Sequence, residues 1–388
     1  MRMVVSAAIL LCVAHGAAKA QSGVTLYGVV DAPIEFVNRI AQGAPTLADG
    51  KLTFQPSGGS RLSMPSSGGL AGNRWGIRGK EELGGGATAL FVLENGFALD
   101  SGSSQLGRLF GRQAFAGIAK ENIGQLTFGR QYSSMFVALA NFVPLRFAPL
   151  YEPAGALLGG TARADNSVNY RGNFGPLSAM AHYSFGVGAA SVGPVPLFNG
   201  GAGEVPGHAG SNAAWGGGLN YERGGLGLSL AYDEWNPSTT VGQEGKSRKA
   251  SMAVSYNTGA VNVMGGYRWG RATYHNGNTL ARDDFWWAGG IYQVNPALGL
   301  TLAFYYWDIK SARLAATAAS ANPVNPWQIS FRSAYALSKR TVVYLTTAYA
   351  RNAGLNFDTS LTGFSSGYFP TSGQNDMLGV TVGLRHTF

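Results

Sequence analysis

Apolar and polar residues alternate along this chain in one segment after another. In LGLSLAY, residues 226–232, the leucines and the tyrosine share one face of an extended strand, and glycine, serine and alanine share the other. A period of two predicts β-strands rather than helices. A half-buried strand of a soluble sandwich alternates in the same way, so the pattern alone leaves open which solvent the apolar face meets. The last nine residues, VTVGLRHTF, repeat it, with one face formed by Val380, Val382, Leu384, His386 and Phe388.

Sixteen segments carry this alternation, and the connections between them alternate in length. Short turns such as ERGG at Glu222 and LSKR at Leu337 follow the even-numbered segments, whereas long connections rich in Gly, Ser, Asn and Pro follow most of the odd-numbered ones. Short turns at one end and long loops at the other are typical of an outer-membrane barrel. The sequence therefore predicts an all-β fold, a transmembrane antiparallel β-barrel of sixteen strands. The predicted strands span residues 24–37, 73–80, 86–99, 109–119, 124–131, 164–173, 176–188, 213–223, 225–235, 247–258, 260–272, 283–293, 298–310, 326–336, 340–352 and 376–388.

The composition favours a barrel in lipid over a soluble fold. Charged residues make up 13% of the chain, against roughly 25% in typical soluble domains. Glycine is abundant, with 57 residues, and the remaining polarity comes mostly from Ser, Thr, Asn and aromatic side chains. Beyond the first residues, no stretch approaches the about 20 apolar residues that a spanning helix needs. A closed barrel is the other structure that satisfies its backbone hydrogen bonds within a bilayer.

The first twenty residues, MRMVVSAAILLCVAHGAAKA, have the plan of a secretory signal, with a positive charge, a short apolar run and small residues at the end. We therefore expect residues 1–20 to be a signal peptide and residues 21–388 to form one barrel domain. The only cysteine, Cys12, lies within the apolar run, and we interpret it as part of that run rather than as a lipid attachment site. Without Arg2 and Lys19, 27 basic and 20 acidic residues remain, a net charge of +7 that favours anionic partners. The basic residues are scattered singly at strand spacing, which argues against nucleic acid as a partner.

Three stretches carry a family resemblance: VTLYGVVDA from Val24, NRWGIRGKEELGGGATALFVLENGF from Asn73, and LFGRQAFAGIAKENIGQLTFGRQY from Leu109. With the terminal Phe388, the sequence resembles the general porins of Gram-negative bacteria over essentially the whole mature chain, most closely the neisserial and burkholderial branch. The resemblance implies a sixteen-stranded barrel, a homotrimer in outer-membrane lipid, and a water-filled pore narrowed by a third loop that folds inward. It also implies that Phe388 closes the barrel against the first strand and is recognised by the barrel-assembly machinery.

Several arginines are expected to line the lumen. In RWGIR, Arg74 and Arg78 share a face opposite Trp75 and Ile77, and lipid would disfavour a cation at the bilayer midplane by about 2–4 kcal/mol. We place Arg112 in the lumen because it lies on the face opposite Phe115. The same alternation puts Arg163 and Arg171 in the lumen, and Glu94 beside them as an acid that softens the potential. The resemblance implies that Arg74, Arg112 and Arg163 form the basic cluster that such porins mount on the wall opposite the inward loop.

Arg130 is an exception to this assignment. Strict alternation places it on the apolar face of Leu126 and Phe128, so that only a bulge or a strand end would aim it inward.

The predicted inward loop, residues 133–160, departs from the family pattern. Such loops usually carry acids facing the basic cluster, but the aligned positions here are Val143 and Phe147, with Arg146 between them and Glu152 as the sole acid. A constriction lined by guanidinium groups without facing carboxylates would concentrate anions and repel cations. We therefore predict an anion-selective diffusion channel for small hydrophilic solutes, narrowed by Phe136, Val143 and Phe147.

Other interpretations stay open at this stage. Arg78 and Arg171 would serve only to brace the wall if they bonded backbone carbonyls. We interpret the pair Trp286 and Trp287, and the rings of Tyr305 and Trp307, as interfacial anchors rather than ligand platforms. The long loops near residues 189–212 and 353–375 would suit an adhesin or receptor, and a barrel enzyme is a further alternative without a supporting motif. The isolated histidines predict no metal site, and no cofactor is expected.

Overall fold

The computed structural model describes residues 23–48, 51–160, 162–188, 203–238, 242–358 and 367–388. The expected signal segment, and parts of the loops considered for an adhesin, lie outside these residues. No helix of the described chain is long and apolar enough to cross a membrane.

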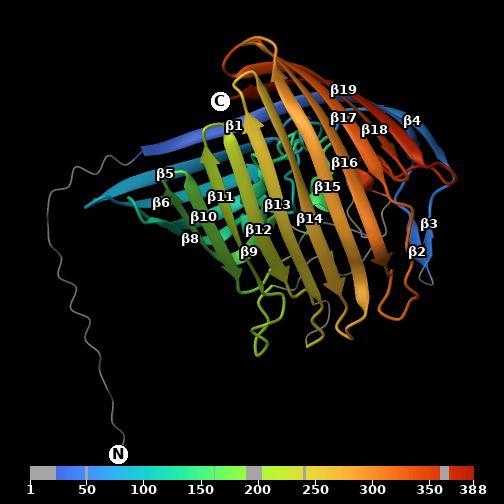
Figure 1. The fold of residues 1–388 in the computed structure, drawn as a ribbon, viewed down its shortest axis with the longest axis horizontal. Coiled ribbons are helices and arrows are strands. Elements are labelled where there is room, and N and C mark those ends of the chain that lie inside the picture. Colours follow the sequence, from blue (N-terminus) through green and yellow to red (C-terminus); the bar gives the residue numbers. More distant parts are fainter. Residues whose placement is uncertain (1–22, 49–50, 161, 189–202, 239–241, 359–366) are drawn as a thin grey trace, which may run out of the picture.

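Sixteen antiparallel strands form a closed barrel, as the alternation predicted (Figure 1). Each strand pairs with its neighbour in sequence, and β1 pairs with β19 to complete the ring. The strands are β1 (Gly23–Ala41), β5 (Arg74–Gly84), β6 (Ala87–Gly96), β7 (Gln113–Lys120), β8 (Gly124–Tyr132), β9 (Arg163–Phe174), β10 (Leu177–Ser184), β11 (Ala214–Arg223), β12 (Leu226–Trp235), β13 (Lys246–Asn257), β14 (Val261–Thr273), β15 (Thr279–Gln293), β16 (Leu298–Ala312), β17 (Trp327–Ala336), β18 (Thr341–Arg351) and β19 (Asp376–Thr387).

Short elements lie in the connections. Between β1 and β5, the strands β2 (Thr46–Ala48) and β3 (Lys51–Thr53) form a small hairpin, and β4 (Gly58–Ser63) pairs with the end of β1. The segment between β8 and β9 contains two helices, α1 (Ser134–Leu139) and α2 (Ala154–Leu158), and a 3₁₀ turn, η2 (Leu355–Phe357), follows β18. The sequence did not predict β2, β3 or β4, because strands of three to six residues are too short to repeat an alternation of apolar and polar residues.

The terminal residue takes part in closing the ring. The N–H of Phe388 donates to the carbonyl oxygen of Gly28 over 3.1 Å, and the N–H of Gly28 donates back over 3.0 Å. The pairing continues along both strands, with Val29 opposite Thr387 and Asp31 opposite Arg385. Closure removes the exposed edges that a strand at either end of the sheet would otherwise present.

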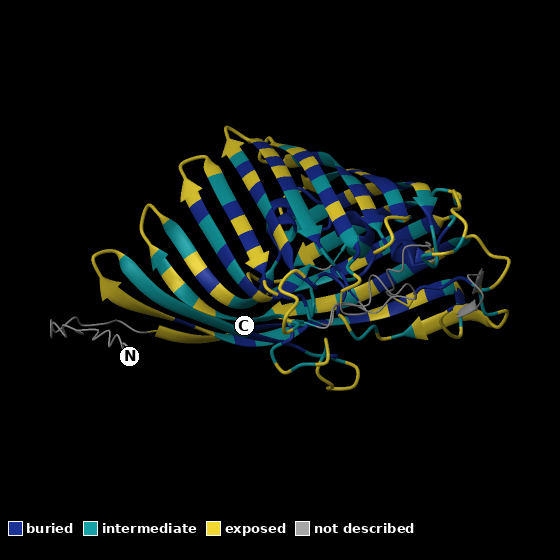
Figure 2. Ribbon diagram, turned by 90° about the horizontal axis from the view of Figure 1, so that it is seen from below, coloured by how far each residue is buried: buried dark blue, intermediate teal, exposed yellow. Residues whose placement is uncertain are grey.

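Burial alternates along the strands, as banding on the ribbon shows (Figure 2). On β12, Leu226, Leu228 and Leu230 are exposed, whereas Gly227, Ser229 and Ala231 are buried. Large apolar side chains on the outer face of a closed barrel need an apolar solvent, and small or polar ones suit an interior. The barrel is therefore built to lie in lipid.

The predicted interfacial role is wrong for three of the four aromatic residues considered. Trp286 is 49% exposed and packs against Tyr267 on the outer face, but Trp287, Tyr305 and Trp307 are almost completely buried on the inner face. The reason is the pleat itself, because neighbouring residues of a strand point to opposite faces, and Trp286 and Trp287 cannot both face lipid.

Candidate functional site

The segment between β8 and β9, residues 133–160, packs against the face of the wall opposite to the exposed apolar face. Strand side chains donate hydrogen bonds to its backbone carbonyls from β11, β12, β14, β15 and β17. The donors are Asn220 Nδ2 and Ser229 Oγ to Ala138 O (3.1 Å each), Trp287 Nε1 to Phe142 O (2.8 Å), Arg268 Nε to Leu157 O (3.1 Å), and Gln328 Nε2 and Ser330 Oγ to Tyr151 O (2.8 and 2.7 Å). Carbonyl oxygens of the segment that no helix or β-sheet pairs thus accept hydrogen bonds from side chains of the barrel wall.

An apolar core holds the same segment in place. Phe142, Val143 and Leu157 are completely buried and pack in one cluster with Phe285 and Trp307 of the wall. Burying side chains of this size stabilises by about 1.5–3 kcal/mol each. Val143, predicted to narrow the bore, belongs to this core and not to the solvent-facing surface of the segment, because an apolar side chain beside the aromatic wall gains more from packing than from water.

The sole acid of the segment is also withdrawn from solvent. Glu152 is 1% exposed. Its carboxylate accepts hydrogen bonds from the hydroxyl of Tyr305 over 2.8 Å and from the N–H of Leu145 over 3.0 Å. Its burial raises the pKa of this carboxyl above its usual range. The surface of the segment therefore presents no carboxylate.

Glu94 forms ion pairs with two of the arginines predicted to line the lumen, Arg74 and Arg112. Its Oε1 accepts from Arg112 Nε over 2.7 Å, and its Oε2 lies 3.7 Å from Arg74 Nε and accepts from the hydroxyl of Tyr27 over 3.0 Å. Glu94 is 4% exposed, so this ion-pair group sits in the wall with its carboxylate covered. The predicted lumenal acid is thus in direct contact with the cluster.

Tyr132, at the end of β8, joins the third arginine to the other two. Its hydroxyl accepts from Arg112 Nη2 over 3.0 Å and from Arg163 Nη2 over 2.9 Å. The guanidinium of Arg163 also lies over the tyrosine ring, 4.5 Å from its centroid, where the ring quadrupole attracts a cation. Arg74, Arg112 and Arg163 are therefore brought together, and the sequence analysis did not identify the tyrosine that connects them.

Arg112 reaches the cluster for a different reason than its sequence predicted. The sequence argument took Phe115 as facing lipid. Residues in register on neighbouring strands point to the same face, and Phe115 is in register with Val92, which is in register with Arg78. Phe115 therefore lies on the inner face, together with Arg78. Arg112 precedes the first residue of β7, Gln113, and strict alternation does not apply to it. The argument from Phe115 was wrong, although the side chain is on the inner side.

A bulge lies beside Arg130, but in the neighbouring strand. From Gly129 to Gln131, a step of two residues along β8 runs opposite a step of three along β9, whereas Arg130 stays in regular register with Ala114 of β7. Arg130 Nη1 then donates to Asp165 Oδ1 over 2.5 Å, and its Nε donates to the carbonyl oxygen of Gly111 over 2.7 Å. Asp165 also accepts from Arg108 over 2.7 Å. The extra residue of the bulge belongs to β9, where it reverses the alternation beside Asp165, the partner of Arg130.

Arg78 and Arg171 make no hydrogen bond or ion pair within the described part of the chain, so neither braces the wall through a carbonyl. Arg78 is exposed, with its guanidinium 5.3 Å from the ring centroid of Tyr27. Arg171 lines a cavity of about 890 Å³ together with Val137 and Asn141 of the segment. The N–H donors of both guanidinium groups are thus without a partner among the described residues.

A stack of three rings connects the segment to the arginine cluster. Phe147 stacks on Phe136 at 4.5 Å between centroids, and Phe136 stacks on Tyr132 at 4.3 Å. Both Phe147 and its exposed neighbour Arg146 have left-handed backbones, with φ of 57° and 56°. Such backbones are unusual for bulky residues and cost on the order of 1–3 kcal/mol each. Arg146 points to solvent and donates to Asn141 Oδ1 over 3.0 Å.

Two further inner-face arginines were not identified from the sequence. Arg332 on β17 is in register with Thr301 and Thr346, and Arg385 on β19 is in register with Asp31. No hydrogen-bond partner reaches Nε or Nη2 of Arg332, or Nε of Arg385, among the described residues. The alternation in ISFRSAYA and VTVGLRHTF could have predicted their inner position, since each arginine falls on the same strand face as its small and polar neighbours.

Comparison with known proteins agrees with this architecture. The family model described as Gram-negative porin matches residues 7–355. An outer membrane porin protein of Bordetella pertussis is 29% identical over 427 aligned positions that cover all of both chains, and outer membrane porin protein 32 of Delftia acidovorans is 27% identical, covering 98% of each chain. Among solved structures, an anion-selective porin from Comamonas acidovorans superposes with a TM-score of 0.70 at 24% identity, over 95% of this chain and 100% of that one. OmpT of Vibrio cholerae gives a TM-score of 0.62 at 14% identity, over 97% and 100%. A match of the family model to nine-tenths of a closed sixteen-stranded barrel places this protein in the Gram-negative porin family of the outer membrane.

Proposed function

We propose that this porin is a passive channel selective for small anions, with its constriction at Arg74, Arg112 and Arg163. The observation that carries the proposal is an imbalance of charge. Three guanidinium groups share one covered carboxylate, Glu94, which pairs with Arg74 and Arg112 while Arg163 is held by Tyr132, and the only acid of the adjacent segment is buried. The low-dielectric wall strengthens the resulting positive potential, which raises the local concentration of anions. Arg78 and Arg171 extend this potential along the lumen, and so do Arg146, Arg332 and Arg385.

The segment between β8 and β9 narrows the pore in this proposal. Its hydrogen bonds and apolar core fix it against the wall of β11–β17, and the stacked rings of Phe136 and Phe147 present half-buried apolar faces beside the arginines. Solutes that combine an anionic group with an apolar edge fit this surface better than strongly hydrated ions do. No step of this function is enzymatic.

The assembly proposed for the channel follows its relatives. One solved form of OmpT of Vibrio cholerae is described as a trimer, and one solved relative is described as anion-selective. We infer a homotrimer, exported through residues 1–20 as a signal peptide and inserted by the barrel-assembly machinery through the strand that ends at Phe388.

The zero-current potential across a potassium chloride gradient tests the proposal on the purified protein in a planar bilayer. The wild type should give a potential with the sign set by chloride. Arg112→Glu and Arg163→Glu should each lower the chloride preference by about tenfold, because reversing a charge beside the path changes the energy of an ion by more than about 1 kcal/mol even in water.

Arg351→Glu is the matched control, since Arg351 is an exposed arginine at the end of β18 and on the outer face. It should leave the potential unchanged. Unaltered selectivity in both inner variants, or a cation-signed wild-type potential, would refute the assignment of the constriction.

A further inference from the structure

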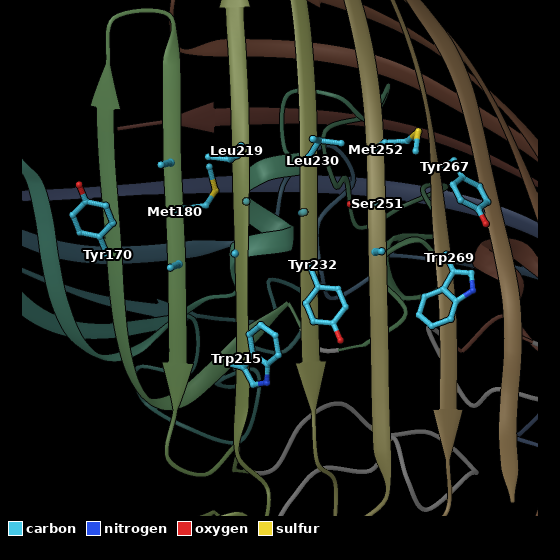
Figure 3. Close-up of a pocket in the computed structure, with 16 residues that line it drawn as sticks. Tyr170, Met180, Trp215, Leu219, Leu230, Tyr232, Ser251, Met252, Tyr267 and Trp269 are labelled. Carbon is cyan, nitrogen blue, oxygen red and sulfur yellow. The ribbon is translucent and has the colours of Figure 1, made fainter. Parts of the chain in front are cut away.

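A groove on the outer face of the barrel is separate from the lumen. It runs across β9–β14 with a volume of about 640 Å³, within the roughly 300–1,000 Å³ range of cavities that hold small-molecule ligands. Figure 3 shows the groove, with the rings of Trp215, Tyr232 and Trp269 gathered at its lower part.

The groove arises from the order of residues across the strands. One row of neighbours in register runs Ala181, Gly217, Tyr232, Ala250 and Trp269. Three small residues between large rings leave a hollow in a surface whose larger outward side chains are leucine, methionine, tyrosine and tryptophan. The depth is therefore encoded in the sequence and does not depend on a mobile loop.

Charged residues form the next row toward the long connections. Arg248, Arg271 and Arg282 are direct cross-strand neighbours on β13, β14 and β15, so their backbones are about 4.8 Å apart. Arg248 is bound to Glu234 over 3.1 Å, and Arg282 is bound to Asp284 over 2.7 Å.

Arg271 lies between these two pairs and is exposed. It has no hydrogen bond or ion pair within the described residues. One row further toward the long connections, Lys246 of β13 lies 3.2 Å from Glu234. Four cations and two carboxylates leave an excess of positive charge at the end of an apolar groove, with Arg271 unneutralised at its centre.

We propose that this surface binds a phosphate-bearing, acylated lipid of the outer membrane, with an acyl chain in the groove and the phosphate on Arg271. Tryptophan and tyrosine mark the headgroup level of a membrane protein, and a guanidinium one row beyond them reaches the phosphate level. A planar guanidinium also matches phosphate oxygens through paired hydrogen bonds. The occupant is thus an anionic amphiphile. The proposal depends on the outer-membrane location and not on the solute selectivity of the pore.

Charge argues against a second copy of this chain as the occupant. Two copies meeting at this face around a twofold axis would bring Arg248, Arg271 and Arg282 against the same row of the other copy. Like charges opposite one another disfavour such an interface, whereas a lipid phosphate neutralises the excess.

Native mass spectrometry of the delipidated protein in detergent tests the proposal. The probes are dimyristoyl phosphatidylglycerol and dimyristoyl phosphatidylcholine, which share their chains and differ in net charge. The wild type should retain the anionic lipid preferentially. Arg271→Ala should weaken that preference about fivefold, the effect expected of one arginine near a lipid phosphate. Gly217→Leu should reduce retention of both lipids, because its side chain fills the floor of the groove; a Cβ there has its nearest neighbour, the oxygen of Met180, at 3.4 Å.

Arg351→Ala is the control for charge, since it removes an exposed outer-face arginine away from the groove. All variants should show wild-type conductance, which establishes that they fold. The proposal is overturned if Arg271→Ala keeps the wild-type preference, if Arg351→Ala loses it equally, or if Gly217→Leu retains both lipids. A change of oligomeric state in Arg271→Ala with unaltered lipid retention would assign the surface to a subunit contact instead.

Discussion

At the scale of single residues, Glu94 determines how much positive charge the cluster retains. Its carboxylate contacts both Arg74 and Arg112, and its replacement by glutamine keeps an acceptor of the same shape without the charge. We predict that Glu94→Gln raises the chloride preference by about twofold to fivefold, since a unit charge about 4 Å away changes the energy of an ion by about 1 kcal/mol in water. The zero-current potential measures this change.

The control for this substitution is Asp308→Asn, which removes a half-buried carboxylate of β16 that is bound to the exposed Lys310. Its potential should equal that of the wild type. A Glu94→Gln channel with equal or lower anion preference would show that the carboxylate does not reach the ion path.

Residue-level prediction from the sequence succeeded where strict alternation held and failed where it was interrupted. Arg74 and Arg78 lie within β5, and the period of two placed both of them on the inner face. The ion pair of Arg130 with Asp165 forms at a bulge of β9, which no pattern of apolar residues encodes. Tyr132 joins the cluster through contacts with Arg112 and Arg163, 20 and 31 residues away in the sequence, and such contacts depend on the register of neighbouring strands and not on local pattern.

At the scale of elements, the inner wall from β14 to β17 serves as the support for the segment between β8 and β9. We predict that Trp287→Phe loosens this segment, because it removes the hydrogen bond to the carbonyl oxygen of Phe142, which leaves that buried acceptor unpaired at a cost of about 1–3 kcal/mol. Single-channel recordings should show larger current fluctuations and more brief closures than the wild type.

Trp286→Phe is the matched control, since Trp286 is the next residue and faces outward. It should leave the recordings unchanged. Equal noise in the two variants would mean that the hydrogen bond does not hold the segment.

The strands themselves were predictable because each is long enough to repeat its alternation several times. The helices α1 and α2 and the strand β4 were not, since they are short and their form follows from the wall they contact. The inner position of Trp287 was accessible in principle from the pleat, but composition alone favoured an interfacial anchor.

At the scale of the whole molecule, the ring is completed by a close approach of Phe388 to Gly28. A Cβ at Gly28 would collide with the phenyl ring and with the backbone of Arg74. We predict that Gly28→Val lowers the stability of the folded barrel by about 1–3 kcal/mol, the range of an overpacked core site. The temperature at which the folded band is lost in heat-modified gel electrophoresis measures this.

Gly23→Val on the same strand is the control, because nothing lies within 4 Å of a Cβ there. Its transition should match the wild type. A Gly28→Val protein that unfolds at the wild-type temperature would show that the terminal ring can move aside without loss.

The inner aromatic cluster has a consequence for how this porin can change. The segment packs on the half of the wall opposite β5–β9, so that one half of the barrel supports it and the other half carries Arg78 and Arg171. We expect substitutions in the supporting half to lower the stability of the barrel, and under the proposed function we expect those around Arg78 and Arg171 to change which solutes pass. Under the proposed function, evolution could therefore change the permeability of the pore by exchanging a few charged residues on β5–β9. The wall that supports the segment between β8 and β9 would stay unchanged.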